Sequence, residues 1–253
     1  MSRSILDLAS PEVAEVVARS RTAVIAIGSV EQHGPHLPCG TDTVAAELVA
    51  RAVADRMDAL LVPFGPYGVT PLHAGHAGTV NLRRATFEAL LTDIADELIA
   101  TGVDRLVLVN WHEGNIASID GVATEVQARY PGVFVVAAQA CYTAQRVYAE
   151  HGGELTHGGG IEALAVLAHD PDLVHVERAG QATRPAHARA LDNMRRDRET
   201  YGYVTDVTEI DAEGWHGDPA WADSGLAAGF AATIGGQIAE RAAHIFSLRA
   251  QAP

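Results

Sequence analysis

The chain has 253 residues, 48% of them apolar, so it can bury a sizeable core. Its formal net charge is −14, from 32 acidic and 18 basic residues, which opposes nucleic-acid binding because that requires a basic surface. No apolar run approaches the roughly 20 residues of a membrane span, and residues 1–9 lack the apolar segment of a secretory signal. With only Cys39 and Cys141, no disulfide framework is expected, and a cytoplasmic location is predicted.

Apolar runs of strand length alternate with helical patterns along most of the chain. β-branched residues predict buried strands at 22–28, 59–64, 105–110 and 133–138. Helices are predicted to begin at Ser10 and to cover 44–57, 86–100, 116–130, 163–169 and 224–248, the last loosened at Gly229, Gly235 and Gly236. Residues 171–223 lack clear periodicity and are expected to form loops with short elements. The alternation predicts the α/β class, with helices on both faces of a mostly parallel sheet in one domain over residues 1–253.

Polar side chains are concentrated in the loops that follow the predicted strands. The loop after the first strand, residues 28–43 (GSVEQHGPHLPCGTDT), contains Glu31, His33, His36 and Asp42. Two further polar pairs follow the third and second strands: His112 with Glu113, and His73 with His76. Because the carboxyl ends of parallel strands share one edge of a sheet, these groups are expected to converge.

The residue types in these loops indicate a metal site. A mixed set of carboxylates and imidazoles suits Zn, Mn or Fe better than a soft thiolate-binding metal. In an extended segment Glu31 and His33 point to the same side, so they could bind two adjacent ions with Asp42 between them. Two ions roughly 3.5–4 Å apart can hold a hydroxide and polarise a carbonyl group, which is hydrolytic chemistry. A single surface Glu or His is ordinary, but five such residues at strand ends favour a metal centre.

Three segments of the chain resemble the creatininase-type amidohydrolases. Residues 28–43 are similar to the family's G-x-x-E-Q-H-G-x-H-L-P-x-x-T-D-T, and residues 106–115 (LVLVNWHEGN) to its L-V-N-G-H-x-x-N. Residues 156–179 (THGGGIEALAVLAHDPDLVHVERA) are similar to its H-[AG]-G-x-x-E-T-S and the P-D-L-V segment that follows. The resemblance runs from about residue 23 to about residue 178, with a weaker match in the C-terminal helix.

The resemblance implies a three-layer α/β/α fold, a binuclear metal centre and a homo-oligomer, often a hexamer. It places Glu31, Asp42 and His112 at the first metal ion. It places His33 and Asp42 at the second ion, so that Asp42 bridges the two.

The resemblance leaves the last ligand of the second ion open. Creatininase takes that ligand from the position occupied here by Gly114, and the resemblance to relatives with a glycine there implies Glu162 of the H-x-G-x-x-E motif instead. Glu113, one residue out of register, is the alternative ligand. His157 matches the family's proton-carrying histidine, and the candidate catalytic residues are His157 and Glu113.

The substrate-binding candidates lie where the chain departs from the family's pattern. His73 and His76 lie in a loop in which His-Ala replaces the family's Phe-Pro, and Trp111 replaces a glycine. Tyr142 falls near an aromatic lid of creatininase, and Gly153 stands where that enzyme has a tryptophan. These departures argue against creatinine itself as the substrate.

The predicted function is hydrolysis of a C–N bond in a cyclic amide, a lactam or another small non-peptide amide. A metal-bridging hydroxide would attack the carbonyl carbon, and His157 would carry the proton to the leaving nitrogen. The alternatives are a formamide hydrolase, a peptidase that trims a modified precursor peptide and, less favoured, a catalytically inactive metal-binding protein. Two divalent ions are expected, zinc before manganese or iron, together with a small-molecule amide substrate and further copies of the chain.

Overall fold

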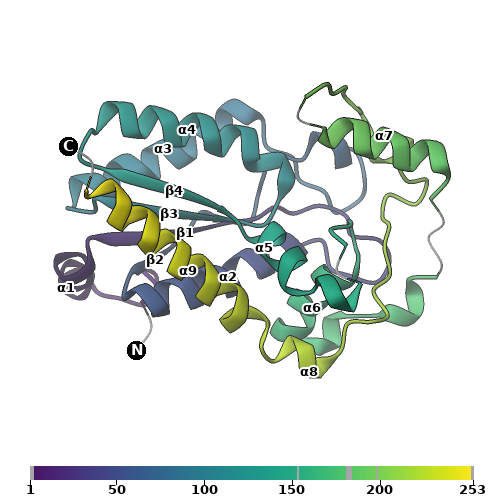
Figure 1. Cartoon of the computed structure of the whole chain (residues 1–253), viewed down its shortest axis with the longest axis horizontal. Helices are drawn as coiled ribbons and strands as arrows, with labels where there is room; N and C mark the ends of the chain where they lie inside the picture. Colours follow the sequence, from purple (N-terminus) through teal and green to yellow (C-terminus); the bar gives the residue numbers. More distant parts are fainter. Residues whose placement is uncertain (1–2, 153, 181–183, 198, 252–253) are drawn as a thin grey trace.

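The computed structural model describes residues 3–152, 154–180, 184–197 and 199–251 (Figure 1). Its sheet has four parallel strands in the order β2-β1-β3-β4. The strands are β1 (Thr22–Ile27), β2 (Leu60–Pro63), β3 (Arg105–Asn110) and β4 (Phe134–Gln139). All four predicted strands are therefore present. The majority of their ends differ by one residue from the predicted bounds.

Helices cover both faces of the sheet (Figure 1). One face packs against α1 (Ser10–Ser20), α3 (Arg84–Ala100) and α4 (Ile116–Arg129). The other packs against α2 (Thr41–Met57), α5 (Ala140–Val147), α6 (Gly160–His169) and α9 (Phe230–Arg249). Side chains of β1 alternate between the two cores, Val24 facing one and Ile25 the other, as a strand buried on both sides requires. The predicted three-layer α/β/α fold is confirmed.

Two helices begin earlier than their apolar patterns predict. Helix α2 starts at Thr41 and α6 at Gly160, each three residues before the predicted start. Of the six residues that open these two helices, Thr41–Thr43 and Gly160–Glu162, only Ile161 is a large apolar residue, so apolar periodicity does not detect these turns. As a result, the carboxylates of Asp42 and Glu162 are held by the first turns of helices, where a negative charge is favoured.

The C-terminal helical pattern is divided at Gly229. Helix α8 (Ser224–Ala227) ends before it, and α9 runs without a break through Gly235 and Gly236. A Cβ atom on Gly235 would lie 2.6 Å from the Cβ atom of Ala52 in α2. The predicted looseness at Gly235 is therefore wrong, because this glycine allows α9 to pack closely on α2.

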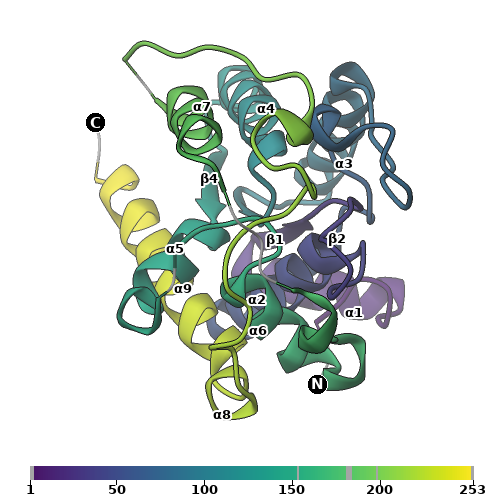
Figure 2. The ribbon, with the colours of Figure 1, turned by 90° about the vertical axis from the view of Figure 1, so that its right-hand side faces the viewer.

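Helix α7 (Ala186–Arg196) lies in the stretch predicted to be irregular. Figure 2 looks onto the end of the molecule where α7 and the chain leading to α8 lie. The buried carboxylate of Asp192 accepts hydrogen bonds from Arg195 of the same helix at 2.7 Å and from Arg184 at 2.8 Å, and Arg184 also donates to the backbone oxygen of Ile210. Apolar periodicity did not predict the helix, because its only large apolar side chains are Leu191 and Met194.

The remaining elements are short 3₁₀ helices, at Pro71–His73, Glu113–Asn115, Ala149–His151, Pro171–Leu173, Val176–Arg178 and Val207–Glu209. A search of the described residues found no helix that is both long enough and apolar enough for a membrane span.

Candidate metal centre and active site

Carboxylates and imidazoles from four segments meet at the carboxyl edge of the sheet. Three overlapping groups could hold a metal ion: Glu31/His33/His157, in which His157 is half-buried, and two groups that share Asp42, Glu31/Asp42/His112 and His33/Asp42/Glu162. Within each group the ligand atoms lie within 4.8 Å of one another, and the five side chains of the last two groups are all buried. Asp42 belongs to both groups, so the geometry contains one shared carboxylate between two sites.

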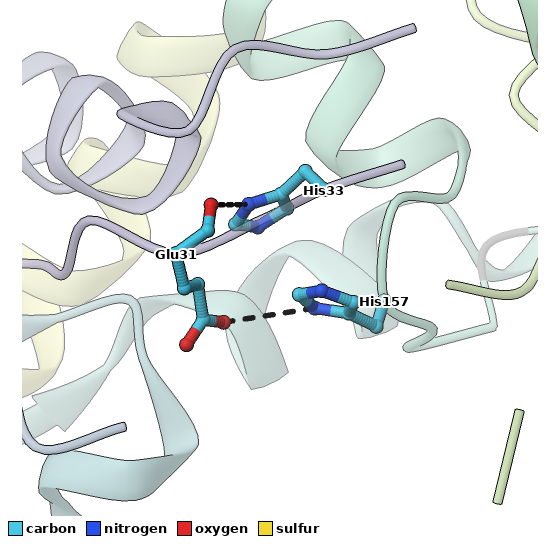
Figure 3. Close-up of side chains that lie close together, drawn as sticks. All are labelled: Glu31, His33 and His157. Carbon is cyan, nitrogen blue, oxygen red and sulfur yellow. Dashed lines mark hydrogen bonds and ion pairs between the residues drawn. The ribbon is translucent and has the colours of Figure 1, made fainter. Parts of the chain in front are cut away.

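His33 is oriented as a metal ligand. Its Nδ1 lies 3.0 Å from the backbone oxygen of Glu31, to which it donates (Figure 3). Nε2 therefore faces the carboxylates, 3.3 Å from Asp42 Oδ1 and 3.7 Å from Glu162 Oε2. This buried nitrogen has no hydrogen-bond partner among the described residues. A buried nitrogen without a partner, facing two carboxylates, fits a bound divalent cation.

His112 faces the first group through its other ring nitrogen. Its Nε2 donates to the backbone oxygen of Val69 at 3.1 Å, which directs Nδ1 toward the carboxylates. Nδ1 lies 3.3 Å from Glu31 Oε1 and 3.0 Å from Asp42 Oδ2. The two histidines thus approach opposite oxygens of Asp42, as expected for a bridging carboxylate.

Hydroxyl groups fix the carboxylates in place. Ser29 donates to Asp42 Oδ2 at 3.0 Å, and Thr70 donates to Glu31 Oε2. The backbone N–H of Gly158 donates to Glu162 Oε2 at 2.5 Å. These contacts leave oxygens of the three carboxylates directed at the imidazoles.

The charges of the centre shift the pKa values of its members in opposite directions. Burial opposes ionisation of Asp42, but His33 and His112 outweigh it and hold the pKa of Asp42 well below its usual value. Burial also opposes protonation of His33 and His112, but the carboxylates raise the pKa of both well above the usual value. The metal-free centre thus keeps protons on these imidazoles, and a divalent cation competes with them for the same lone pairs.

His157 lies beside the ligands and is oriented differently. Its Nε2 donates to the backbone oxygen of Gln32 at 2.6 Å, which leaves Nδ1 3.6 Å from Glu31 Oε1 (Figure 3). Burial and the neighbouring His33 and His73 lower the pKa of His157 well below its usual value. A neutral imidazole with a free nitrogen directed at the centre can accept and return a proton.

The centre lies in the wall of a cavity of about 510 Å³. His73 lines this cavity, with its ring 4.2 Å from that of His157 and its Nε2 3.8 Å from Glu31 Oε1. Burial lowers the pKa of His73 to about 4. Glu113 lines the same cavity, whereas Tyr142 is not among the described residues that line it; the Tyr142 hydroxyl donates to Glu113 Oε1 at 2.9 Å.

The other predicted residues are placed differently. Glu113 forms ion pairs with Arg195 and Arg196 instead of joining either ligand group. Trp111 reaches the cavity, but it is 2% exposed and packs against Phe230 in the core. His76 is half-buried 3.6 Å from Asp206, and it is not among the described residues that line the cavity. Gly153 lies outside the described residues.

Several site residues were not predicted. Gln32 Nε2 lies 3.0 Å from His73 Nδ1 and 3.2 Å from His157 Nε2, and it donates to the backbone oxygen of Gly214. The sequence could have indicated Gln32, because it stands between Glu31 and His33 in the same motif. No motif pointed to Arg195 and Arg196, which belong to the helix that apolar periodicity did not predict.

The protein has a three-layer α/β/α fold with a parallel sheet, and two overlapping nitrogen–oxygen ligand groups lie beside a neutral histidine. These features define its class as a metal-binding hydrolytic enzyme. The chain belongs to the creatininase family, because the family model described as "Creatininase: Creatinine amidohydrolase" matches residues 6–242. It is therefore a creatininase-family hydrolase that acts on C–N bonds.

Individual relatives support this membership. A "Mycofactocin precursor peptide peptidase" of Mycobacterium ulcerans (strain Agy99) is 34% identical over 210 residues, 79% of this chain and 75% of the relative. A creatinine amidohydrolase of Pseudomonas putida is 31% identical over 183 residues, 65% of this chain and 70% of the relative. A crystal structure of creatinine amidohydrolase (creatininase) superposes with a TM-score of 0.77 at 27% identity, over 97% of this chain and 98% of that one.

Proposed function

We propose that this chain hydrolyses an amide bond in a peptide-sized substrate, with two divalent ions at the centre. Glu31, Asp42 and His112 would hold one ion, and His33, Asp42 and Glu162 the other. When bound, the ions would supply an activated water and a Lewis acid for the carbonyl oxygen. Zinc or manganese suits this nitrogen–oxygen donor set, and one solved relative, at 26% identity, is described as "Creatininase Mn".

His157 is the proposed proton carrier. Its Nε2–H is fixed on the backbone oxygen of Gln32, so Nδ1 alone faces the centre. It would accept a proton from the attacking water and return it to the leaving nitrogen as the C–N bond breaks. The water then contributes a hydroxyl group to the carbonyl carbon and a hydrogen to the amine.

The observation that carries the choice of substrate is the size of the cavity. A volume of about 510 Å³ lies in the range that encloses ligands of drug size, roughly 300–1,000 Å³. A small lactam would fill only part of it, whereas a few peptide residues would fill it. The relatives described as "Mycofactocin precursor peptide peptidase" support the same choice, which was an alternative from sequence alone.

A small cyclic amide is the second candidate. It is favoured by the 31% identity to the creatinine amidohydrolase of Pseudomonas putida. Under this alternative, water would occupy the rest of the cavity during turnover.

The test is turnover by the purified chain loaded with zinc or manganese. Unmodified and cyclised peptides, creatinine, lactams and formamides are incubated with it, and products are identified by liquid chromatography and mass spectrometry. Cleavage of a peptide, lost after chelation and in Glu31→Gln, is expected. Turnover of creatinine or a lactam without any peptide cleavage would show that the second candidate is correct.

A further inference from the structure

Two arginines of α7 give the cavity a feature that hydrolysis itself does not require. Arg195 and Arg196 line the same cavity as the metal centre, together with Arg84. The acidic residues of the lining are the three carboxylates of the ligand groups and Glu113. With the metal ligands set aside, three guanidinium groups therefore face one carboxylate, in a chain of net charge −14.

The internal partners of these arginines hold them without neutralising them. Asp192 accepts from Arg195 at 2.7 Å and lies 3.3 Å from Arg196 Nε, but it also accepts from Arg184 at 2.8 Å. Asp192 and Glu113 thus share their two negative charges among three arginines, of which Arg184 also interacts with the carboxylate of Asp211. Burial opposes ionisation of Asp192, yet the three arginines lower its pKa to about 2, so it stays charged at neutral pH.

The carboxylate of Glu113 forms ion pairs with both arginines. Its Oε2 lies 3.3 Å from Arg196 Nη2 and 3.7 Å from Arg195 Nη2, while Oε1 accepts from Tyr142. No hydrogen bond joins Glu113 to either guanidinium group in the described part of the chain. Arg196 Nη1 donates to the backbone oxygen of Leu155 at 3.3 Å, and Arg195 donates to Asp192 through Nε and Nη2. Among the described residues, Nη1 of Arg195 and Nη2 of Arg196 make no hydrogen bond and remain available to a ligand, with side-chain exposures of 23% for Arg195 and 31% for Arg196.

We propose that Arg195 and Arg196 bind a carboxylate of the substrate and position the scissile amide at the metal centre. Guanidinium groups recognise carboxylates through two parallel N–H···O bonds, and they stay charged when partly buried. Glu113, which they contact, follows the metal ligand His112 directly in the chain. A carboxylate bound there lies on the side of the cavity next to the centre, so the pair would select acidic substrates.

This inference rests on the proposed peptide substrate, and its test uses three forms of one peptide that the enzyme cleaves. One form has a free C-terminal carboxylate, the second a C-terminal amide, and the third a C-terminal amide with an acidic side chain nearby. We expect kcat/KM to be at least 10-fold higher for a form with a carboxylate than for the neutral amide. Preference for the first form indicates a terminal carboxylate, and preference for the third an acidic side chain.

The variants Arg195→Gln and Arg196→Gln separate positioning from general damage. Each should lower kcat/KM for the preferred acidic form by about 10-fold or more and leave the neutral amide within about 2-fold. Arg189→Gln, on the exposed side of the same helix, is the matched control and should change neither. Thermal unfolding and metal content are measured for every variant. Arg196→Lys keeps the charge but loses the planar guanidinium group, so its kcat/KM for the acidic form should lie between those of the parent and Arg196→Gln.

Equal losses for acidic and neutral peptides, or no preference in the parent protein, would refute carboxylate recognition. If no peptide is cleaved at all, the proposed function fails, and the inference is then decided by binding. Metal-loaded protein is titrated calorimetrically with N-acetyltyrosine and with its amide. Tighter binding of the acid that is lost in both variants supports the inference. Equal binding of the two, no binding, or acid binding unchanged in the variants contradicts it.

Discussion

Gly114 shows how one residue limits which side chains can reach the candidate metal centre. A Cβ atom there would lie 2.1 Å from the backbone oxygen of Val69 and 2.4 Å from His112 Nε2. Any side chain would therefore displace the hydrogen bond that directs His112 at the centre. The ligand that creatininase is expected to take from this position has no room here, which supports Glu162 as its replacement.

Glu162→Gln should therefore reduce metal binding to about one ion per chain. An amide presents a neutral oxygen in place of a carboxylate, so it binds a divalent cation more weakly. Glu113→Gln is the control, because Glu113 faces Arg195 and Arg196 and should leave two ions bound. Mass spectrometry of metals after gel filtration measures both. Loss of an ion in Glu113→Gln, with two retained in Glu162→Gln, would reverse the assignment.

His157→Asn should lower kcat by about 10²–10⁴-fold while metal content stays the same. Asparagine can donate to the backbone oxygen of Gln32, but it cannot carry the proton at Nδ1. Steady-state rates with metal-loaded protein provide the measurement, and His187→Asn on the exposed part of α7 is the control. Activity within a few-fold of the parent would remove His157 from the proton transfer.

At the scale of elements, α7 depends on charge rather than on apolar burial. Asp192 is 4% exposed and contacts three arginines, two of which line the cavity. An α-helix on the surface usually buries an apolar stripe, and this one substitutes a buried carboxylate. The stability of α7 packing should therefore depend on pH. A helix held by apolar burial alone would not show this dependence.

The stabilisation from Asp192 should be lost in acid. Its pKa is about 2 in the folded chain against an ordinary 3.8, so it contributes on the order of 2 kcal/mol above pH 4. That contribution falls as the pH drops from about 4 to about 2, because the unfolded state takes up a proton in this range while the folded carboxylate stays ionised. Urea unfolding across this range should show Asp192→Asn less stable than the parent at pH 7, with a shrinking difference below pH 4.

The matched control for this experiment is Asp120→Asn, because Asp120 is exposed on α4. A stability difference for Asp192→Asn that does not change between pH 7 and pH 2 would mean that its charge is not what fastens α7.

At the scale of the whole molecule, the metal centre joins segments distant in the sequence. Its ligands come from the loop after β1, the first turns of α2 and α6, and the segment after β3. Three carboxylates are buried together there, so bound cations would stabilise the arrangement of the layers as well as the reaction.

Removing both ions should lower the thermal unfolding midpoint by roughly 10–20 °C. Ligand at 100 times its Kd contributes about 2.7 kcal/mol per site, and each kcal/mol corresponds to about 2–4 °C in a chain of this size. Calorimetry of metal-loaded and chelated protein measures the difference, and added zinc should restore it. A midpoint indifferent to chelation, with the metal shown to be removed, would contradict this coupling.

The sequence by itself determined the layers and most of the centre. Apolar runs of strand length specify buried parallel strands, and polar residues cannot follow them into the core, so they gather at the carboxyl edge. This reasoning brings Glu31, His33, Asp42 and His112 together before any coordinates are known. The same reasoning did not predict helix α7, because that helix is short, mostly polar and has only Leu191 and Met194 as large apolar side chains.

Only the tertiary structure decided the contacts between distant segments. The clash at Gly114 involves Val69, and the orientation of His157 depends on Gln32, 125 residues away. Likewise Arg195 and Arg196 gain a role through Glu113 and the shared cavity. Local patterns encode which face a side chain takes, whereas distances between separate loops depend on how the layers pack.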